Sequence, residues 1–133
     1  MIVVIDTNIL ISALHFEKMG STIDRALVRA MSEDVIAICP EIESELSNTL
    51  TAKFNWSPDR VLAALSSVLG RAMRVRITGS LQLCRDRHDD MFLECAEVAG
   101  ADLLITGDND LLVLGNHHRT RIITPAEYVS LAG

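Results

Sequence analysis

Two of the predicted strands in this 133-residue chain lead directly into acidic side chains. The apolar run at 2–5 is followed by Asp6, and the run at 103–106 is followed by Gly107 and Asp108. Each acid also has an ordinary explanation, because Asp6 could cap the next helix and Asp108 could occupy a turn. Both acids, however, follow buried apolar strands that give a carboxylate little solvation. Their occurrence at the same end of two strands therefore favours a shared site.

A third group of acids comes just before a predicted helix that carries Phe92 and Leu93. It consists of Asp86, Asp89 and Asp90. One acid in this position would serve as a helix cap, because carboxylates are favoured at the positive end of the helix dipole. Three acids exceed what capping requires, and they indicate that a positive group is held nearby. Arg85 and Arg87 of the same segment could be that group.

Glutamates at the start of another predicted helix form the fourth group. Glu41, Glu43 and Glu45 follow Pro40, and all three could be acids of the kind that is favoured in a first helical turn. On a helical projection, Glu43 and Glu45 flank the apolar stripe on opposite sides. Periodicity therefore leaves the choice between these two glutamates open.

Carboxylates that converge at the carboxyl ends of parallel strands are typical of a site for Mg²⁺ or Mn²⁺, which prefer oxygen ligands. In open parallel sheets, ligands bind at this edge, where the order of the strands reverses. A metal ion would offset the repulsion among the acids, which is about 4 kcal/mol per pair at 4 Å and an effective dielectric of 20. Such sites hydrolyse or transfer phosphoryl groups.

Other catalytic and binding motifs are weak or missing. The sequence has no glycine-rich dinucleotide loop, no Walker loop and no G-x-S-x-G nucleophile motif. The residues at 108–110 resemble the start of a calcium loop, but apolar residues at 111–113 stand where oxygen ligands are needed. His117 and His118 are adjacent, so on a helix or strand they would point in different directions. A haloacid-dehalogenase-like phosphatase would need a second acid where Asn8 stands.

Net charge leaves nucleic acid open as a substrate. The formal charge of -6 comes from 18 acids and 12 bases, and such a balance usually argues against a polyanion binder. If four acids hold a metal, however, the rest of the molecule is close to neutral. Ten of the bases are arginines, which suit bidentate contacts with phosphate. The three cysteines lack C-x-x-C spacing, and we interpret them as reduced thiols of a cytoplasmic protein without a signal peptide or membrane span.

The apolar patterns predict one α/β domain over residues 1–133. Short apolar runs typical of strands alternate with amphipathic helical periods, which implies right-handed crossovers and a parallel sheet covered on both faces. Helix starts are marked by Ser21, by Ser57 and by Thr124. The expected strands span residues 2–5, 35–38, 74–77, 103–106 and 121–123.

The four acidic groups, in this order, resemble the PIN domain, a family of small Mg²⁺- or Mn²⁺-dependent ribonucleases that includes the toxins of VapC-like toxin-antitoxin pairs. The opening MIVVIDTNILISAL is similar to the family's first strand and D-T-N signature, and ESELSNTLTAKF is similar to its E-L-x-x-x-L segment. CRDRHDDMFLECAEVAGADLLITGDNDLL resembles the family's most specific stretch. The resemblance covers the whole chain, and the ordered combination of motifs is highly specific.

The resemblance also implies roles for individual residues. It selects Glu45 over Glu43 and places the third acid at Asp89, although relatives commonly carry asparagine at the position of Asp90. The implied metal-binding and catalytic acids are Asp6, Glu45, Asp89 and Asp108. The implied supporting residues are Asn8, Thr106 and the accessory acids Asp86 and Asp110.

The fold implied by the resemblance is a three-layer α/β/α sandwich with a five-stranded parallel sheet in the order 3-2-1-4-5. The implied activity is that of an endoribonuclease, in which one or two Mg²⁺ or Mn²⁺ ions activate a water for attack on an RNA phosphodiester. An antitoxin protein is the implied partner, and we expect a homodimer. The alternatives are a PIN-fold RNA-binding module without turnover, a housekeeping RNA-processing nuclease and a Mg²⁺-dependent phosphatase.

Overall fold

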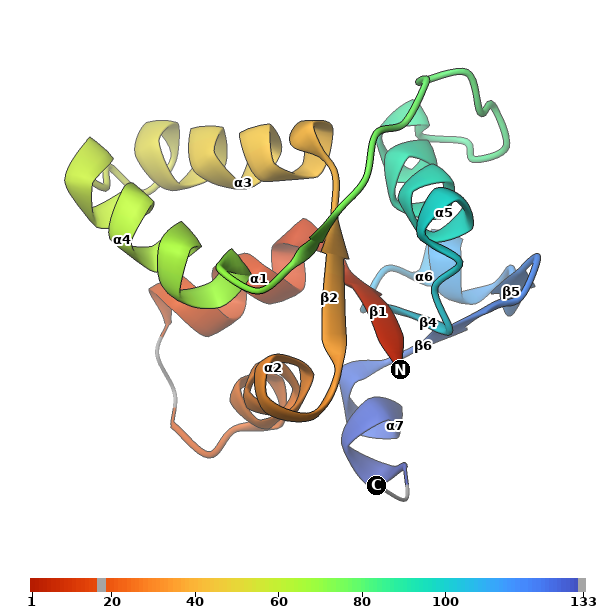
Figure 1. Ribbon diagram of the computed structural model, residues 1–133, viewed down its shortest axis with the longest axis horizontal. Helices are drawn as coiled ribbons and strands as arrows, with labels where there is room; N and C mark the ends of the chain where they lie inside the picture. Colours follow the sequence, from red (N-terminus) through yellow and green to blue (C-terminus); the bar gives the residue numbers. More distant parts are fainter. Residues whose placement is uncertain (17–18, 132–133) are drawn as a thin grey trace.

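The computed structural model describes residues 1–16 and 19–131, and a six-stranded sheet runs through its centre in the order β3-β2-β1-β4-β6-β5 (Figure 1). Neighbouring strands are parallel except for β5, which is antiparallel to β6. The strands are β1 (Ile2–Ile5), β2 (Val35–Ile38), β3 (Met73–Arg74), β4 (Leu103–Ile105), β5 (Asn116–His117) and β6 (Thr120–Ile123).

Helices cover both faces of this sheet, as the alternating patterns predicted. In Figure 1, α5 lies on one side of the sheet and α2 and α7 on the other, while α3 and α4 form a pair that extends outward. The helices are α1 (Thr7–His15), α2 (Thr22–Glu33), α3 (Pro40–Ala52), α4 (Pro58–Leu69), α5 (Arg87–Ala99), α6 (Asn109–Leu112) and α7 (Pro125–Ser130).

The expected count of five strands is not confirmed. The parallel strands have the predicted order, with β6 as the fifth, but β5 adds a short antiparallel edge strand. The chain can turn back here because Gly115 and His118 adopt left-handed backbone conformations, with φ of 74° and 52°. A strand of two residues leaves no periodic signal in the sequence, and for this reason β5 was not expected.

The predicted helix starts are confirmed, with one correction. The side chains of Ser21, Ser57 and Thr124 each accept a hydrogen bond from the backbone of the first helical turn. The fifth helix, however, begins at Arg87, so Asp89 lies within its first turn and not before it. This shift matters for the site, because a residue inside the helix has its direction fixed by the helical period.

Strands β1 and β4 form the middle of the core. Three residues of β1 and all three of β4 are buried, as expected for parallel strands with helices on both faces. Ile5 pairs with Ile105, so the next residues along each strand, Asp6 and Thr106, lie side by side. Cys39, Cys84 and Cys95 are all free thiols. In the described part of the chain, no helix is long and apolar enough to cross a membrane.

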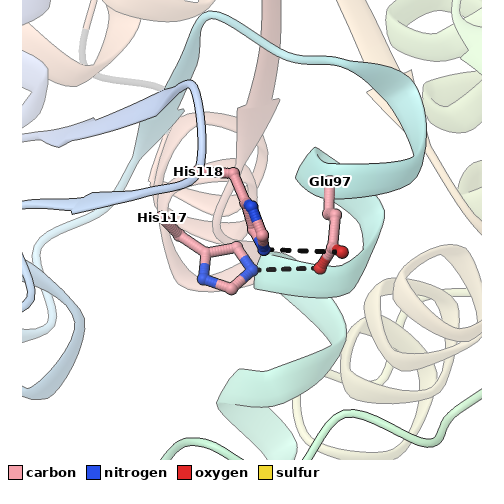
Figure 2. A group of neighbouring side chains, drawn as sticks. All are labelled: Glu97, His117 and His118. Carbon is pink, nitrogen blue, oxygen red and sulfur yellow. Dashed lines mark hydrogen bonds and ion pairs between the residues drawn. The ribbon is translucent and has the colours of Figure 1, made fainter.

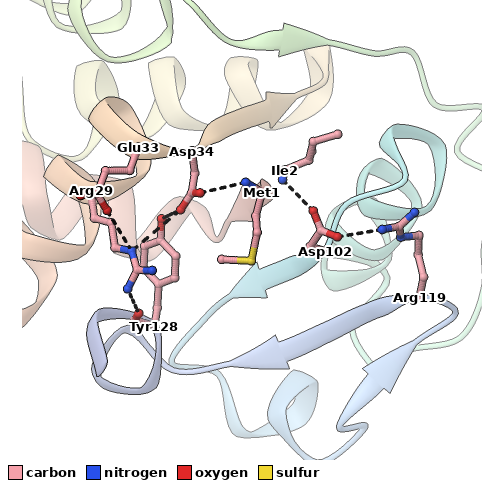
Figure 3. Close-up of polar contacts among 8 residues, drawn as sticks. All are labelled: Met1, Ile2, Arg29, Glu33, Asp34, Asp102, Arg119 and Tyr128. Carbon is pink, nitrogen blue, oxygen red and sulfur yellow. Dashed lines mark hydrogen bonds and ion pairs between the residues drawn. The ribbon is translucent and has the colours of Figure 1, made fainter. Parts of the chain in front are cut away.

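Paired charges hold the edge of the sheet where the strands begin (Figure 3). Asp102 accepts hydrogen bonds from the backbone of Ile2 at 2.9 Å and from the guanidinium of Arg119 at 2.8 Å. Asp34 accepts a hydrogen bond from the hydroxyl of Tyr128. The acids at this edge therefore have donors that compensate their charge.

Candidate metal centre

Asp6 has a fixed orientation at the opposite edge, where the strands end. Thr106 Oγ1 donates a hydrogen bond of 2.6 Å to Asp6 Oδ2, and both side chains are buried. Asp6 Oδ1 accepts a hydrogen bond of 3.0 Å from the backbone N–H of Asn8 and thereby caps α1. Asp6 can therefore cap α1 with one carboxylate oxygen and still belong to a functional site.

The loop after β4 brings two more acids close to Asp6. Thr106 Oγ1 accepts a hydrogen bond of 3.0 Å from the backbone N–H of Asp108. Asp108 Oδ1 in turn accepts a hydrogen bond of 2.9 Å from the backbone N–H of Asp110 and caps α6. The hydroxyl of Thr106 therefore connects Asp6 to the acids of this loop.

Acids from this loop and from α5 converge. Asp89, Asp108 and Asp110 each offer one carboxylate oxygen, and these oxygens lie within 4.8 Å of one another. Asp89 is buried, whereas Asp110 is exposed, so the group opens toward solvent. Among residues 1–16 and 19–131, no lysine, arginine or histidine lies within ion-pair distance of the three acids. We call these three residues the acidic cluster.

Charge repulsion and burial both act on the acidic cluster. Burial, followed by the negative charge of Asp108, raises the pKa of Asp89 to about 7. Burial also raises the pKa of Asp6, although hydrogen bonds from Thr106 and Asn8 oppose this shift. A divalent cation among these oxygens would relieve the repulsion, and a ligand set made only of carboxylates fits Mg²⁺ or Mn²⁺.

Glu43 and Glu45 contact different neighbours on the two sides of α3. Glu43 pairs with Arg74 of β3. Glu45 Oε2 lies 2.6 Å from His88 Nε2, next to Asp89 on α5, and this contact raises the pKa of His88. Glu45 therefore lies on the side of α3 near the acidic cluster, but it is not one of the three acids that gather there. His88 has no ligand spacing in the sequence, so its contact with Glu45 was not expected.

Asp90 holds a loop and does not join the acidic cluster. Its Oδ1 accepts hydrogen bonds from the backbone N–H groups of Leu83 at 3.0 Å and Cys84 at 2.7 Å. Burial alone would raise the pKa of Asp90, but these hydrogen bonds lower it below its usual range. Consecutive helical residues point about 100° apart. The helix thus directs Asp89, and not Asp90, toward Asp108.

Glu94 is a second buried acid of α5 that holds the same loop, and its role was not expected from the sequence. Its carboxylate accepts hydrogen bonds from the backbone N–H groups of Thr78, Gly79 and Leu81. Glu94 follows Asp90 by four residues, which places both acids on one side of the helix. That spacing was the available signal. Together the two carboxylates fix the loop between β3 and α5 next to the site.

The Glu94→Gln variant should lose about 2 kcal/mol of unfolding free energy, because a neutral amide forfeits hydrogen bonds to a charged acceptor. Although Glu94 is buried, its hydrogen bonds lower its pKa. Its contribution is therefore complete above the unfolded-state pKa of about 4.3 and is lost as the pH falls through the lower folded-state pKa. Urea unfolding at pH 7 and pH 3 measures this, and a variant deficit that is equal at both pH values would contradict the prediction.

The expected supporting residues have different surroundings. Thr106 is fully buried and contacts both Asp6 and Asp108, whereas Asn8 is exposed and contributes its backbone N–H. Asp86 is exposed and caps α5 by accepting a hydrogen bond of 2.9 Å from the backbone of His88. Asp110, expected only as an accessory acid, is a member of the acidic cluster.

Comparison with known proteins agrees with this fold. A chain in the crystal structure of VapBC2 from Rickettsia felis, bound to a DNA fragment from their promoter, is similar with a TM-score of 0.64. It shares 15% sequence identity, and the similarity covers 93% of this chain and 98% of that chain, which shows a common fold. No curated protein sequence matches significantly. The PIN domain family matches residues 2–110, from β1 to the last acid of the acidic cluster, and the chain therefore belongs to the PIN domain family.

Proposed function

We propose that this protein is a Mg²⁺- or Mn²⁺-dependent endoribonuclease, the toxin component of a toxin-antitoxin pair that acts in the cytoplasm. PIN domains are in general nucleases, and the family match covers most of the chain. The observation that carries the proposal is the acidic cluster, in which three carboxylates meet beside Asp6 without a cationic partner among the described residues. Such a group fits a divalent cation better than it fits a purely structural role.

The chain's own residues would divide the work of the site. Asp6, Glu45, Asp89 and Asp108 are proposed as metal ligands and catalytic acids, and the geometry favours adding Asp110 to this set. When bound, the cation would supply an activated water and a positive charge for the phosphoryl oxygens. Thr106 would keep Asp6 in one orientation through its hydrogen bond, and any ionised carboxylate could orient the water.

A groove beside the acids could hold the RNA backbone. It has a volume of about 630 Å³ and lies between α3 and α5, with Glu45, Asn48, Arg76 and His88 in its walls. Arg76 and His88 offer N–H donors to phosphate, and Asn48 offers an amide. Among the described residues that line this groove there is no Phe, Tyr or Trp for base stacking. The groove therefore favours contacts to phosphate and sugar.

The nuclease proposal is tested by cleavage of a labelled RNA. The protein should cleave it with Mn²⁺ and not with EDTA, and Asp108→Asn should slow cleavage by at least about 100-fold because it removes a proposed ligand of the charge-stabilising cation. Asp59→Asn is the matched control, since Asp59 is an exposed acid in the first turn of α4.

Other outcomes of this assay would point to the alternatives. Cleavage that survives in EDTA, or in the Asp108→Asn variant, would overturn the metal site. RNA binding without turnover would favour a binding module, and hydrolysis of a phosphomonoester alone would favour a phosphatase.

The toxin part of the proposal is supported by the fold shared with a chain of the VapBC2 complex. We propose an antitoxin whose basic side chain enters among the acids, because an uncompensated acidic site attracts an arginine or lysine. Expression without this partner should halt growth, and Asp6→Asn should restore it. Normal growth with active protein present would contradict the toxin role, and the nuclease role would still depend on the cleavage assay. The homodimer stays a prediction that light scattering can check.

A further inference from the structure

A second group of potential metal ligands lies at the far end of α5 from the acidic cluster. It consists of Glu97, His117 and His118, whose ligand atoms lie within 4.8 Å of one another (Figure 2). Glu97 belongs to the last turn of α5, while the histidines come from β5 and the turn that leads to β6. Glu97 lies eight positions after Asp89 on the helix, a distance of about 12 Å along the axis. The two groups are therefore separate sites.

The backbone at His118 explains why two adjacent histidines converge. On a regular strand or helix, the conformation expected from the sequence, neighbouring side chains point apart. His118 instead has a φ of 52°, in the left-handed region, within the turn between β5 and β6. Its ring meets the ring of His117 edge to face, with the ring centroids 4.5 Å apart. The expectation of a regular backbone is therefore wrong at this position. The two histidines point the same way and can bind one ion together.

Both imidazoles present the same nitrogen to the carboxylate of Glu97. His117 Nε2 lies 3.1 Å from Glu97 Oε2, and His118 Nε2 lies 3.5 Å from Glu97 Oε1 (Figure 2). His117 is only 9% exposed and is held in the ladder between β5 and β6, whereas Glu97 and His118 face solvent. One ligand is thus rigidly placed, and the open side gives an ion access.

The charged neighbour of this group is already engaged elsewhere. Arg119 follows His118 in the sequence and would repel a cation if its guanidinium pointed toward the histidines. Its guanidinium instead donates a hydrogen bond of 2.8 Å to Asp102 (Figure 3). Because Arg119 pairs with Asp102, the carboxylate of Glu97 keeps its negative charge available to a divalent ion.

We propose that Glu97, His117 and His118 form a second metal site, which takes Zn²⁺ in preference to Mg²⁺ or Mn²⁺. Two imidazole nitrogens and one carboxylate oxygen are a ligand set that zinc uses when it keeps its fourth position open for water. Imidazole also favours late first-row ions, whereas sites made only of carboxylates suit Mg²⁺ and Mn²⁺. A bound ion would join the end of α5 to the turn between β5 and β6. The site is independent of the proposed nuclease function.

Metal titrations of the metal-free protein test this proposal. Zn²⁺ binding is followed by calorimetry, and Co²⁺, as a spectroscopic substitute, reports nitrogen ligation through its visible absorption. Glu97→Gln and His118→Asn should each weaken Zn²⁺ binding at least tenfold, since loss of an outer-shell partner alone costs 10–100-fold. Asparagine is chosen at position 118 because it tolerates the left-handed backbone. Glu97 lies on α5 and His118 in the turn between β5 and β6. If one variant fails to fold, the other still tests the proposal.

Asp108→Asn is the matched control for the second site. It should weaken Mn²⁺ binding at the acidic cluster and leave the high-affinity Zn²⁺ site unchanged, whereas His118→Asn should have the reverse effect. Zn²⁺ affinity that is the same in wild type, Glu97→Gln and His118→Asn would overturn the proposal. Loss of Zn²⁺ binding in Asp108→Asn alone would do so as well, because it would place the ion at the acidic cluster.

Discussion

The Asp89→Asn variant should lose RNA cleavage and keep its fold, whereas the neighbouring Asp90→Asn variant should keep cleavage and lose stability. Asp89 is the buried member of the acidic cluster, and its carboxylate would bind the cation directly. We expect cleavage to slow by at least about 100-fold, the magnitude typical for removal of one group that stabilises transition-state charge. The metal-free Asp89→Asn protein should be at least as stable as wild type, because repulsion from Asp108 disappears.

Asp90→Asn should behave differently because Asp90 accepts hydrogen bonds from the backbone of Leu83 and Cys84. Replacing the carboxylate with an amide should lower the unfolding free energy by about 2 kcal/mol. Initial rates of RNA cleavage and urea unfolding, measured on the same samples, separate the two effects. If both variants remain folded and lose cleavage equally, Asp89 is not the acid that faces the cation.

Glu45 and Glu43 offer the same comparison on α3. Glu45→Gln should abolish most cleavage, because Glu45 is a proposed metal ligand and contacts His88, the residue before Asp89 on α5. Glu43→Gln should retain it, because Glu43 pairs with the exposed Arg74 at the far flank of the helix. Equal loss in both variants would show that the second acid has been placed incorrectly.

The edge of the sheet that carries the site could be predicted because it follows from strand pairing. Asp6 and Thr106 each come one residue after a run of buried β-branched or leucine residues, and parallel pairing of those runs brings the two together. The helix caps at Ser57 and Thr124 could be predicted for a similar reason, since the signal and the contact lie within four residues.

The features that escaped prediction depend on contacts across long loops or on single backbone angles. Glu94 and Asp90 appear in the sequence as helix acids, and only the folded loop at 78–84 shows what they bind. The convergence of His117 and His118 depends on one left-handed residue in a two-residue turn. Periodicity carries no information about such an angle, because it averages over several residues of regular structure.

Mn²⁺ should raise the melting temperature of the protein by about 10 °C when its concentration is about 100 times its dissociation constant. Binding at that excess adds about 2.7 kcal/mol to the unfolding free energy, and a domain of this length gains about 3–5 °C per kcal/mol. The physical reason for this stabilisation is that the acids at the two edges of the sheet differ in how far their charge is compensated. Asp34 and Asp102 have hydrogen-bond donors at one edge, while the acidic cluster at the other lacks a cation among the described residues.

The Asp108→Asn variant separates relief of repulsion from any general effect of salt. In EDTA it should melt at a higher temperature than wild type, because one of the crowded charges is gone, and its melting temperature should rise little with Mn²⁺. The His118→Asn variant should respond to Mn²⁺ as wild type does, since the histidines lie at the other end of α5. Thermal scans of the wild-type protein that superimpose in EDTA and in Mn²⁺ would show that the acidic cluster holds no metal. The burial and the repulsion from Asp108 that together raise the pKa of Asp89 would then lower the stability of the fold without compensation.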